Sequence, residues 1–144
     1  VEKENALFGG RFSGHYAFRE TYCTDDAIFA AMKVVEILSN SDRKFSELVD
    51  AIPVYHSTKM QEIPCSDDKK FMIVEKIKQK VQKDFRIFDI DGVKMFGDSG
   101  WVLVRASNTA PIIRVIAEGK TKEVAERFHQ TGQQLVMEEI ANYQ

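Results

Sequence analysis

The sequence predicts an α+β fold whose main part is a four-stranded antiparallel sheet with two helices on one face. Apolar residues recur at helical spacing on both sides of a group of short runs that alternate like strands. Turn sequences at 91–92 and 97–100 separate neighbouring runs, as in antiparallel strands. The tail of another domain, with one good helix, is expected to precede this part.

Three amphipathic helices are predicted, over residues 26–39, 67–83 and 121–141. Each begins at a side chain suited to an N-terminal cap, namely Asp25 or Asp26, Asp67-Asp68, and Thr121. A shorter helix is expected over 44–51. His129 falls on the third long helix, where we expect a solvated surface residue.

Four short strands are predicted between the second and third long helices: 86–91, 93–96, 101–105 and 112–118. The Asp91-Gly92 pair is a strong turn signal between the first two. A further strand is allowed over 59–65, where Pro64 restricts it to an edge or an end.

This order predicts a domain remnant over residues 1–50, a hinge over 51–57 and a second domain over 58–144. The first 50 residues are too few to close a hydrophobic core of their own. The sequence also begins without Met. We therefore expect a piece of a longer protein.

Composition excludes several classes of protein. Lys and Arg number 20 against 22 Asp and Glu, so the clustered basic excess of a nucleic-acid binder is absent. No apolar run approaches the roughly 20 residues that span a bilayer. The two cysteines, Cys23 and Cys65, lack metal or redox spacing and are expected to be reduced thiols. These observations predict a cytoplasmic protein with no nucleic-acid or membrane partner.

Two segments carry residue types suited to ligand binding. The first, 9–15, combines three glycines with Arg11, Ser13 and His15, so backbone, hydroxyl, imidazole and guanidinium groups lie together. Composition alone favours a plain glycine-rich turn here, since short glycine patterns occur often by chance.

The second segment, 105–111, follows a predicted strand with one Arg and three small hydrogen-bonding side chains. Arg105 offers bidentate donors to a phosphate, and Ser107, Asn108 and Thr109 offer hydroxyl and amide groups. The same chemistry suits an ordinary β-turn, and the residues by themselves leave the two interpretations equal.

Together the two segments resemble the α-D-phosphohexomutase family, in particular its phosphomannomutase/phosphoglucomutase members. Gly10-Arg11-Phe12-Ser13-Gly14-His15 resembles the family's sugar-binding loop, Gly-Glu-x-Ser-Gly-His. Residues 105–111, Arg-Ala-Ser-Asn-Thr-Ala-Pro, resemble its phosphate-binding loop, Arg-x-Ser-Asn-Thr-Glu-Pro. The resemblance implies the tail of an α/β domain 3, followed by the TATA-box-binding-protein-like domain 4.

The resemblance implies an isomerase that interconverts hexose 1-phosphate and hexose 6-phosphate. In this family a phosphoserine and Mg²⁺ are held by the first two domains, and glucose or mannose 1,6-bisphosphate is the intermediate and activator. Arg105, Ser107, Asn108 and Thr109 would bind the phosphate of a phosphorylated hexose. Ser13 and His15 would bind its sugar, with Arg11 a weaker candidate. The chain itself would contain no catalytic or metal-binding residue, would be inactive alone, and would work with the remaining domains.

Two positions depart from the family pattern: Arg11 and Ala110 each stand where the family has Glu. Two alternatives stay open, the second of them because of these two departures. One is a phosphoglucosamine mutase, although the phosphate-binding loop of that subgroup has the pattern Ser-Gly-Thr where this chain has Ser107-Asn108-Thr109. The other is a phosphosugar-binding relative without catalysis.

Overall fold

The computed structural model describes residues 5–11 and 13–143. The chain forms two compact units, Val1–Pro53 and Val54–Gln144, here called the first and second units and described separately. The division falls inside the segment predicted as a hinge, and hinge motion there stays a prediction. Within the described residues, no helix is both long and apolar enough to cross a membrane.

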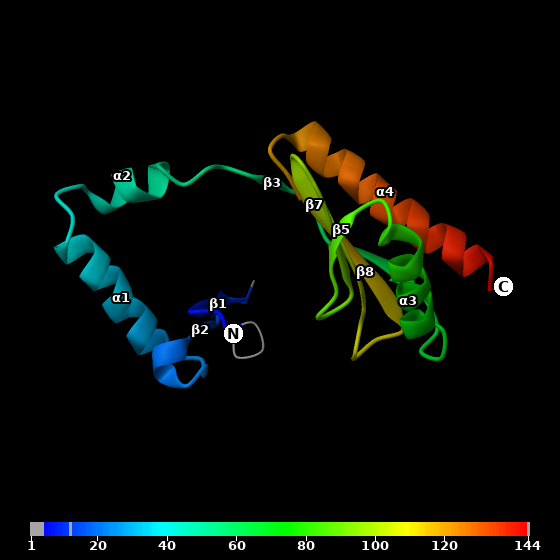
Figure 1. The fold of residues 1–144 in the computed structure, drawn as a ribbon, viewed down its shortest axis with the longest axis horizontal. Coiled ribbons are helices and arrows are strands. Elements are labelled where there is room, and N and C mark those ends of the chain that lie inside the picture. Colours follow the sequence, from blue (N-terminus) through cyan, green and yellow to red (C-terminus); the bar gives the residue numbers. More distant parts are fainter. Residues whose placement is uncertain (1–4, 12, 144) are drawn as a thin grey trace. The chain divides into compact units, whose positions relative to one another are not determined.

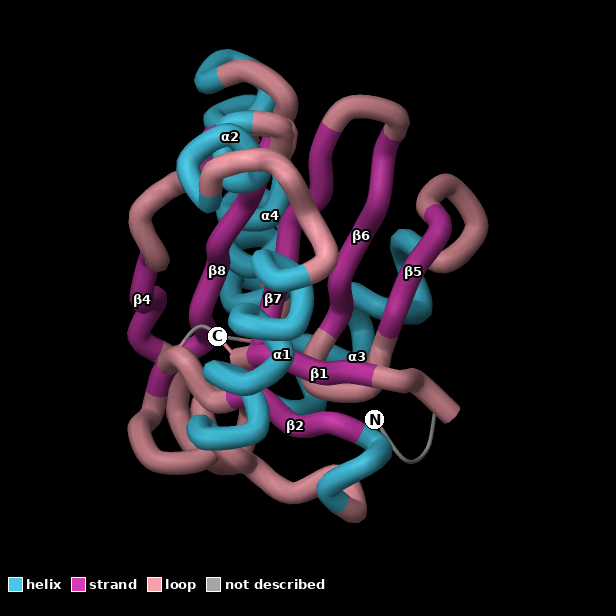
Figure 2. The backbone as a smooth tube through the Cα atoms, turned by 90° about the vertical axis from the view of Figure 1, so that its left-hand side faces the viewer, coloured by secondary structure: helices cyan, strands magenta, loops and turns pink. Residues whose placement is uncertain are grey.

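The second unit is an antiparallel sheet covered on one face by two helices, as predicted (Figure 1). Its strands run in the order β3-β8-β7-β6-β5, and β4 also pairs with β8. Figure 2 shows β4, β8, β7, β6 and β5 side by side. The strands are β3 (His56–Ser57), β4 (Gln61–Pro64), β5 (Arg86–Phe88), β6 (Val93–Gly97), β7 (Gly100–Ala106) and β8 (Ile112–Gly119). The helices are α3 (Lys70–Val81) and α4 (Lys122–Ala141).

The sheet has six strands, so the prediction of four was wrong in number. The eight-residue β8 is long enough to pair with two short segments on one edge. Its end pairs with β3, His56 opposite Gly119, and its beginning pairs with β4, Pro64 opposite Ile112. The segment predicted at 59–65 is thus an edge strand, as Pro64 requires.

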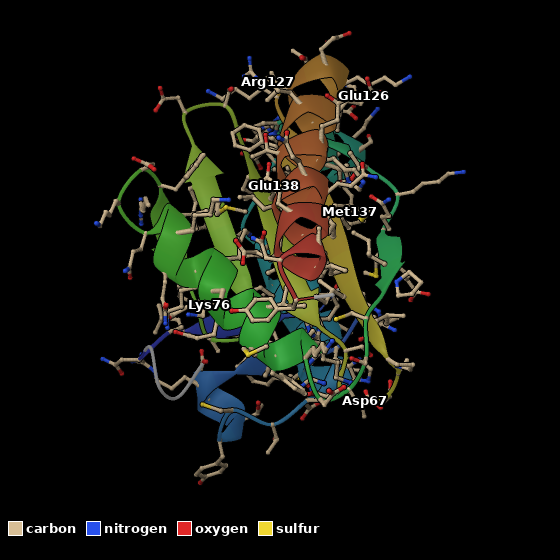
Figure 3. The ribbon with its side chains drawn as sticks, turned by 90° about the vertical axis from the view of Figure 1, so that its right-hand side faces the viewer. Asp67, Lys76, Glu126, Arg127, Met137 and Glu138 are labelled. Atoms are coloured by element: carbon tan, nitrogen blue, oxygen red, sulfur yellow. The ribbon has the colours of Figure 1, made fainter. Side chains whose placement is uncertain are left out.

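Alternation along the strands places one face of the sheet in the core. The buried strand residues are Val93 and Met95 of β6, Val102, Val104 and Ala106 of β7, and Ile113, Val115 and Ala117 of β8. Helix α4 approaches this face closely at Gly132, where a Cβ would lie 2.6 Å from Cγ2 of Val102. Figure 3 looks onto the two helices from their solvent side, with Lys76 of α3 and Met137 of α4 on the exposed surface.

Helix α4 begins where predicted, because the Thr121 hydroxyl accepts the N–H of Val124. Helix α3 begins at Lys70, three residues later than predicted. The Ser66 carbonyl accepts the N–H groups of both Lys69 and Lys70, which makes a separate turn before the helix. Asp67 pairs with Lys70 and does not cap the helix.

His129 of α4 is half-buried, so the expectation of a solvated surface residue was wrong. Its Nδ1 lies 2.9 Å from the Thr58 hydroxyl and its Nε2 lies 2.8 Å from the Gln61 side-chain oxygen. Burial lowers the pKa of His129 below its ordinary value. The imidazole therefore ties α4 to the segment that contains β3 and β4.

The first unit contains a β1–β2 hairpin (Phe8–Gly10 and Tyr16–Phe18) and the helices α1 (Ala27–Ser39) and α2 (Phe45–Asp50). Both helices were predicted, and the Asp26 carboxylate accepts the Phe29 N–H at the start of α1. The Phe18 ring contacts the rings of Phe8 and Phe29 and so joins the hairpin to α1. None of the described residues in this unit is buried.

Candidate functional site

The first candidate site is the β7–β8 loop, residues 107–111, together with Arg105 at the end of β7. Val104 and Ala106 are buried under the helices. Since side chains alternate along a strand, Arg105 lies on the opposite face of the sheet. The seven-residue β7 pairs with strands on both sides, so it holds the Arg105 backbone rigidly.

The Arg105 side chain contacts the turn between β5 and β6. Its Nε lies 3.1 Å from Oδ2 of Asp91, and the side chain remains 35% exposed. The Nε atom itself is buried and makes no well-aligned hydrogen bond within the described residues, so the contact with Asp91 is mainly electrostatic. Because a guanidinium has five N–H donors in a planar fork, its outer nitrogens stay available to an anion.

Gly92 allows the turn to approach Arg105 this closely. Its φ is +85°, in the region that favours glycine. A Cβ on Gly92 would lie 2.4 Å from the Val104 carbonyl oxygen and 2.9 Å from the Arg105 Cα. The Asp91-Gly92 turn predicted from the sequence therefore also supports the Arg105 backbone.

Internal hydrogen bonds shape the β7–β8 loop. The Ser107 N–H donates to the Ile112 carbonyl over 3.0 Å. The Ser107 hydroxyl is fully buried and accepts the Thr109 N–H at 3.3 Å. Asn108 and Thr109 are exposed. The loop thus presents an amide and a hydroxyl on the surface, beside the partly exposed Arg105.

A buried cation that the sequence analysis did not single out lies against this loop. Lys70 is 3% exposed, and its Nζ donates to the Ala110 carbonyl over 3.0 Å. The sequence contained a signal, because Lys70 shares the helical spacing of the buried Val74, Ile77 and Val81. A lysine on the apolar side of a helix is unusual unless its charge is paired.

The second candidate site is the β1–β2 loop, residues 11–15, in the first unit. The Arg11 N–H donates to the His15 carbonyl, and the Gly14 N–H donates to the Arg11 carbonyl. The Ser13 hydroxyl lies 2.6 Å from Nδ1 of His15. Arg11, Ser13 and His15 are all exposed. Phe12, which belongs to the motif, lies outside the described residues.

The structure thus groups the predicted residues into two clusters. Arg105, Ser107, Asn108 and Thr109 lie together at one end of the sheet, and Arg11, Ser13 and His15 lie together in one hairpin loop. Ser13 pairs with Nδ1 of His15, so Nε2 of the imidazole lies outside that pair. Binding by either cluster stays a prediction.

A metal site does not fit the described part of the chain. No group of three or more His, Cys, Asp or Glu side chains there is arranged to hold an ion. The two carboxylates that follow β5 pair with cations, since Asp91 contacts Arg105 and Asp89 lies 2.7 Å from Nζ of Lys78. Phosphate binding by these residues would therefore rest on side-chain and backbone donors.

Comparison with known protein families matches both units. The model of the phosphoglucomutase/phosphomannomutase C-terminal domain matches residues 61–131. The model of alpha/beta/alpha domain III of phosphoglucomutase/phosphomannomutase matches residues 1–55. The two matches follow one another in the order in which the domains are numbered.

Similar curated proteins are named as sugar-phosphate mutases. A probable phosphoglucosamine mutase from Methanosarcina barkeri is 39% identical over 83% of this chain and 27% of its own length. Another from Methanosarcina acetivorans is 35% identical over 97% of this chain and 31% of its own length. A phosphoglucomutase/phosphomannomutase from Thermococcus kodakarensis is 35% identical over 96% of this chain and 30% of its own length.

A solved structure supports the same fold. A phosphoglucomutase/phosphomannomutase family protein from Burkholderia thailandensis matches with a TM-score of 0.75, over 96% of this chain and 29% of that one, at 22% identity. At this identity the similarity establishes the fold alone. The chain spans about a third or less of the length of each of these relatives.

Proposed function

We propose, given that this chain belongs to the phosphoglucomutase/phosphomannomutase family, that the β7–β8 loop binds the phosphate group of a phosphorylated hexose. The family comprises mutases that act on sugar phosphates, and the chain matches its domain III and its C-terminal domain. The observation that carries the proposal is the position of Arg105. It stands on a rigid strand beside a loop that exposes an amide and a hydroxyl.

These groups have the chemistry that a phosphate requires. The Arg105 fork can donate two parallel hydrogen bonds to phosphate oxygens, and charge-assisted bonds of this kind are roughly twice as strong as neutral ones. Asn108 and Thr109 add neutral donors from the loop surface. Ser107 serves the same anion through the loop, because its buried hydroxyl holds the Thr109 N–H.

The β1–β2 loop is the proposed contact for the sugar. If the Ser13 hydroxyl donates a hydrogen bond to Nδ1 of His15, the imidazole is the tautomer that carries its N–H at Nε2. That N–H would be a donor for a sugar hydroxyl. Arg11 supplies only donors where the family pattern has an acceptor. Any sugar contact it makes would therefore differ from the one that a Glu would make.

The phosphoryl-transfer step is proposed to need groups outside this chain. A phosphoserine, Mg²⁺ and a hexose 1,6-bisphosphate intermediate would be held by domains that correspond to the rest of the relatives' length. The exposed apolar face of α1, with Ile28 77% and Met32 62% exposed, supports packing against such domains. The chain alone is expected to show no mutase activity, and its proposed location is the cytoplasm.

The preferred hexose would be identified by comparing the enzyme's activity on different hexose phosphates. The similar proteins carry two names, phosphoglucosamine mutase and phosphoglucomutase/phosphomannomutase. We place this chain with the hexose-phosphate mutases as a class. The ratio of kcat/KM values for glucosamine, glucose and mannose phosphates in a mutase containing this segment would separate the two names. Turnover of none of them would favour the non-catalytic alternative.

Arg105→Ala in a full-length mutase containing this segment tests the phosphate site. Loss of charge-assisted bonds worth roughly 1.5–3 kcal/mol each should raise KM about 10- to 150-fold. Arg105→Lys should recover only part, since an ammonium lacks the planar fork. Arg114→Ala is the matched control, because Arg114 lies opposite Arg105 on β8 and pairs with Glu62. If the two Arg105 variants keep the wild-type KM, the β7–β8 loop is not the phosphate site.

A further inference from the structure

We propose that Lys70 is a positioning residue that holds the β7–β8 loop in the conformation that binds phosphate. The proposal rests on the function proposed above for that loop. Lys70 would act through the Ala110 carbonyl, without touching the phosphate itself. It would make the loop ready for the anion before the anion arrives.

The first support is the burial of a cation where an apolar residue would pack well. The Lys70 side chain is 4% exposed, whereas its partner Asp67 is 71% exposed. Withdrawing an ammonium from water is costly unless hydrogen bonds replace the lost hydration. Here the Asp67 carboxylate and the Ala110 carbonyl accept from Nζ. One of these two hydrogen-bond acceptors therefore belongs to the β7–β8 loop.

The second support is the number of restraints on Ala110. Its carbonyl accepts from Nζ of Lys70 at 3.0 Å and from the Ile112 N–H at 2.8 Å. Pro111 follows, and a residue before proline is restricted to extended backbone conformations. Two donors and a proline thus fix the backbone of Ala110. They also keep its carbonyl dipole from turning toward an anion.

The third support is that the restrained loop keeps backbone N–H groups available to an anion. Within the described part of the chain, the N–H groups of Asn108 and Ala110 donate to no protein acceptor. These two N–H groups lie on either side of Thr109, whose own N–H is held by the Ser107 hydroxyl, and both are available as donors to an anion. A binding site gains affinity when its groups are held in place beforehand, because less ordering is needed on binding. Lys70 would supply that order from the first turn of α3.

Lys70→Met in the 144-residue chain tests the proposal, because Met keeps much of the side-chain length and removes the donor and the charge. Binding of glucose 6-phosphate is followed by two-dimensional NMR titration at a temperature where every variant is folded. We expect the Kd to rise roughly 10-fold, since a loop that must be ordered on binding loses about this much affinity. Lys70→Arg, which keeps charge and donors, should recover part of the affinity.

Two controls separate positioning from simpler effects. Lys76→Met removes the same charge from an exposed position of the same helix (Figure 3) and should leave the Kd within about 2-fold, because salt screens distant surface charges. Val81→Ala removes core volume at the far end of α3, where Val81 is buried. It should lower the melting temperature without changing the Kd.

The outcomes are distinct. If Lys70→Met binds like wild type, or if Val81→Ala weakens binding as much, Lys70 has no positioning role, while the proposed function stands. If the wild-type chain shows no binding of glucose 6-phosphate, the function proposed for the loop fails and this proposal fails with it. Should Lys70→Met not fold, backbone order parameters of the ligand-free wild-type chain decide. Values near 0.85 for the loop would support a preformed site, and values below 0.6 would overturn it.

Discussion

Gly92→Ala is the substitution whose effect on stability the structure predicts most directly. Two costs add at this position. The first is the φ of +85°, which costs an Ala about 1–2 kcal/mol relative to its preferred region. The second is the overlap of the new Cβ with the Val104 carbonyl oxygen at 2.4 Å. Because that atom is backbone in a central strand, either β7 or the turn must move.

Together these costs predict a loss of about 2–4 kcal/mol in the free energy of unfolding. For a domain of this size, each kcal/mol shifts the melting temperature by roughly 4–8 °C, so the expected decrease is about 8–32 °C. Thermal unfolding followed by circular dichroism at 222 nm measures it. Glucose 6-phosphate binding to the folded variant should also weaken, since the Cβ would press on Arg105.

Gly97→Ala is the matched control in the same sheet. Its Cβ would lie 2.6 Å from the Phe128 ring, at a backbone φ outside the glycine region. A half-buried ring can shift where a strand carbonyl cannot, so the expected cost is about 1 kcal/mol. A Gly92→Ala protein that melts within about 3 °C of wild type, or above Gly97→Ala, would refute this reasoning.

Two further predictions concern the second unit. Burial lowers the pKa of His129 below 6.5, so the unfolded chain takes up a proton at a higher pH than the folded chain. The contribution of the neutral, buried His129 to stability is therefore present above about pH 6.5. This contribution is lost as the pH falls from 6.5 toward the lower pKa of the folded state. Urea midpoints between pH 7.5 and 5 should therefore fall less in His129→Gln than in wild type, and parallel curves would contradict this. Residues 54–144 alone should fold with a melting temperature within about 5 °C of the whole chain's main transition, because every buried residue among those described lies between Ile63 and Val136. An unfolded amide spectrum of this truncated protein would show that the first unit is needed.

Local patterns were sufficient for most of the helices and strands. Apolar spacing and the Asp26 and Thr121 caps located α1 and α4 to within a residue, because caps and periodicity act over one or two turns. The Asp91-Gly92 pair marked the turn between β5 and β6 in the same way. The two candidate loops were also visible as motifs, since each is a continuous segment of the chain.

Features that depend on distant partners were not visible in the sequence. The start of α3 moved to Lys70 because Ser66 closes a separate turn, and β3 joined the sheet because β8 is long enough to pair with it. His129 looked like a surface residue because its partners, Thr58 and Gln61, are about 70 residues away.

For the candidate site, the sequence by itself determined which residues could bind phosphate, because Arg105 and the three small polar residues after it are contiguous. Only the tertiary structure decided how that loop is supported. It placed Asp91 beside Arg105, removed the space for a side chain at Gly92, and put the Lys70 ammonium on the Ala110 carbonyl. The physical reason is that burial and hydrogen bonding between segments depend on how helix and sheet pack. Residue type and spacing along the chain therefore do not predict contacts between distant segments.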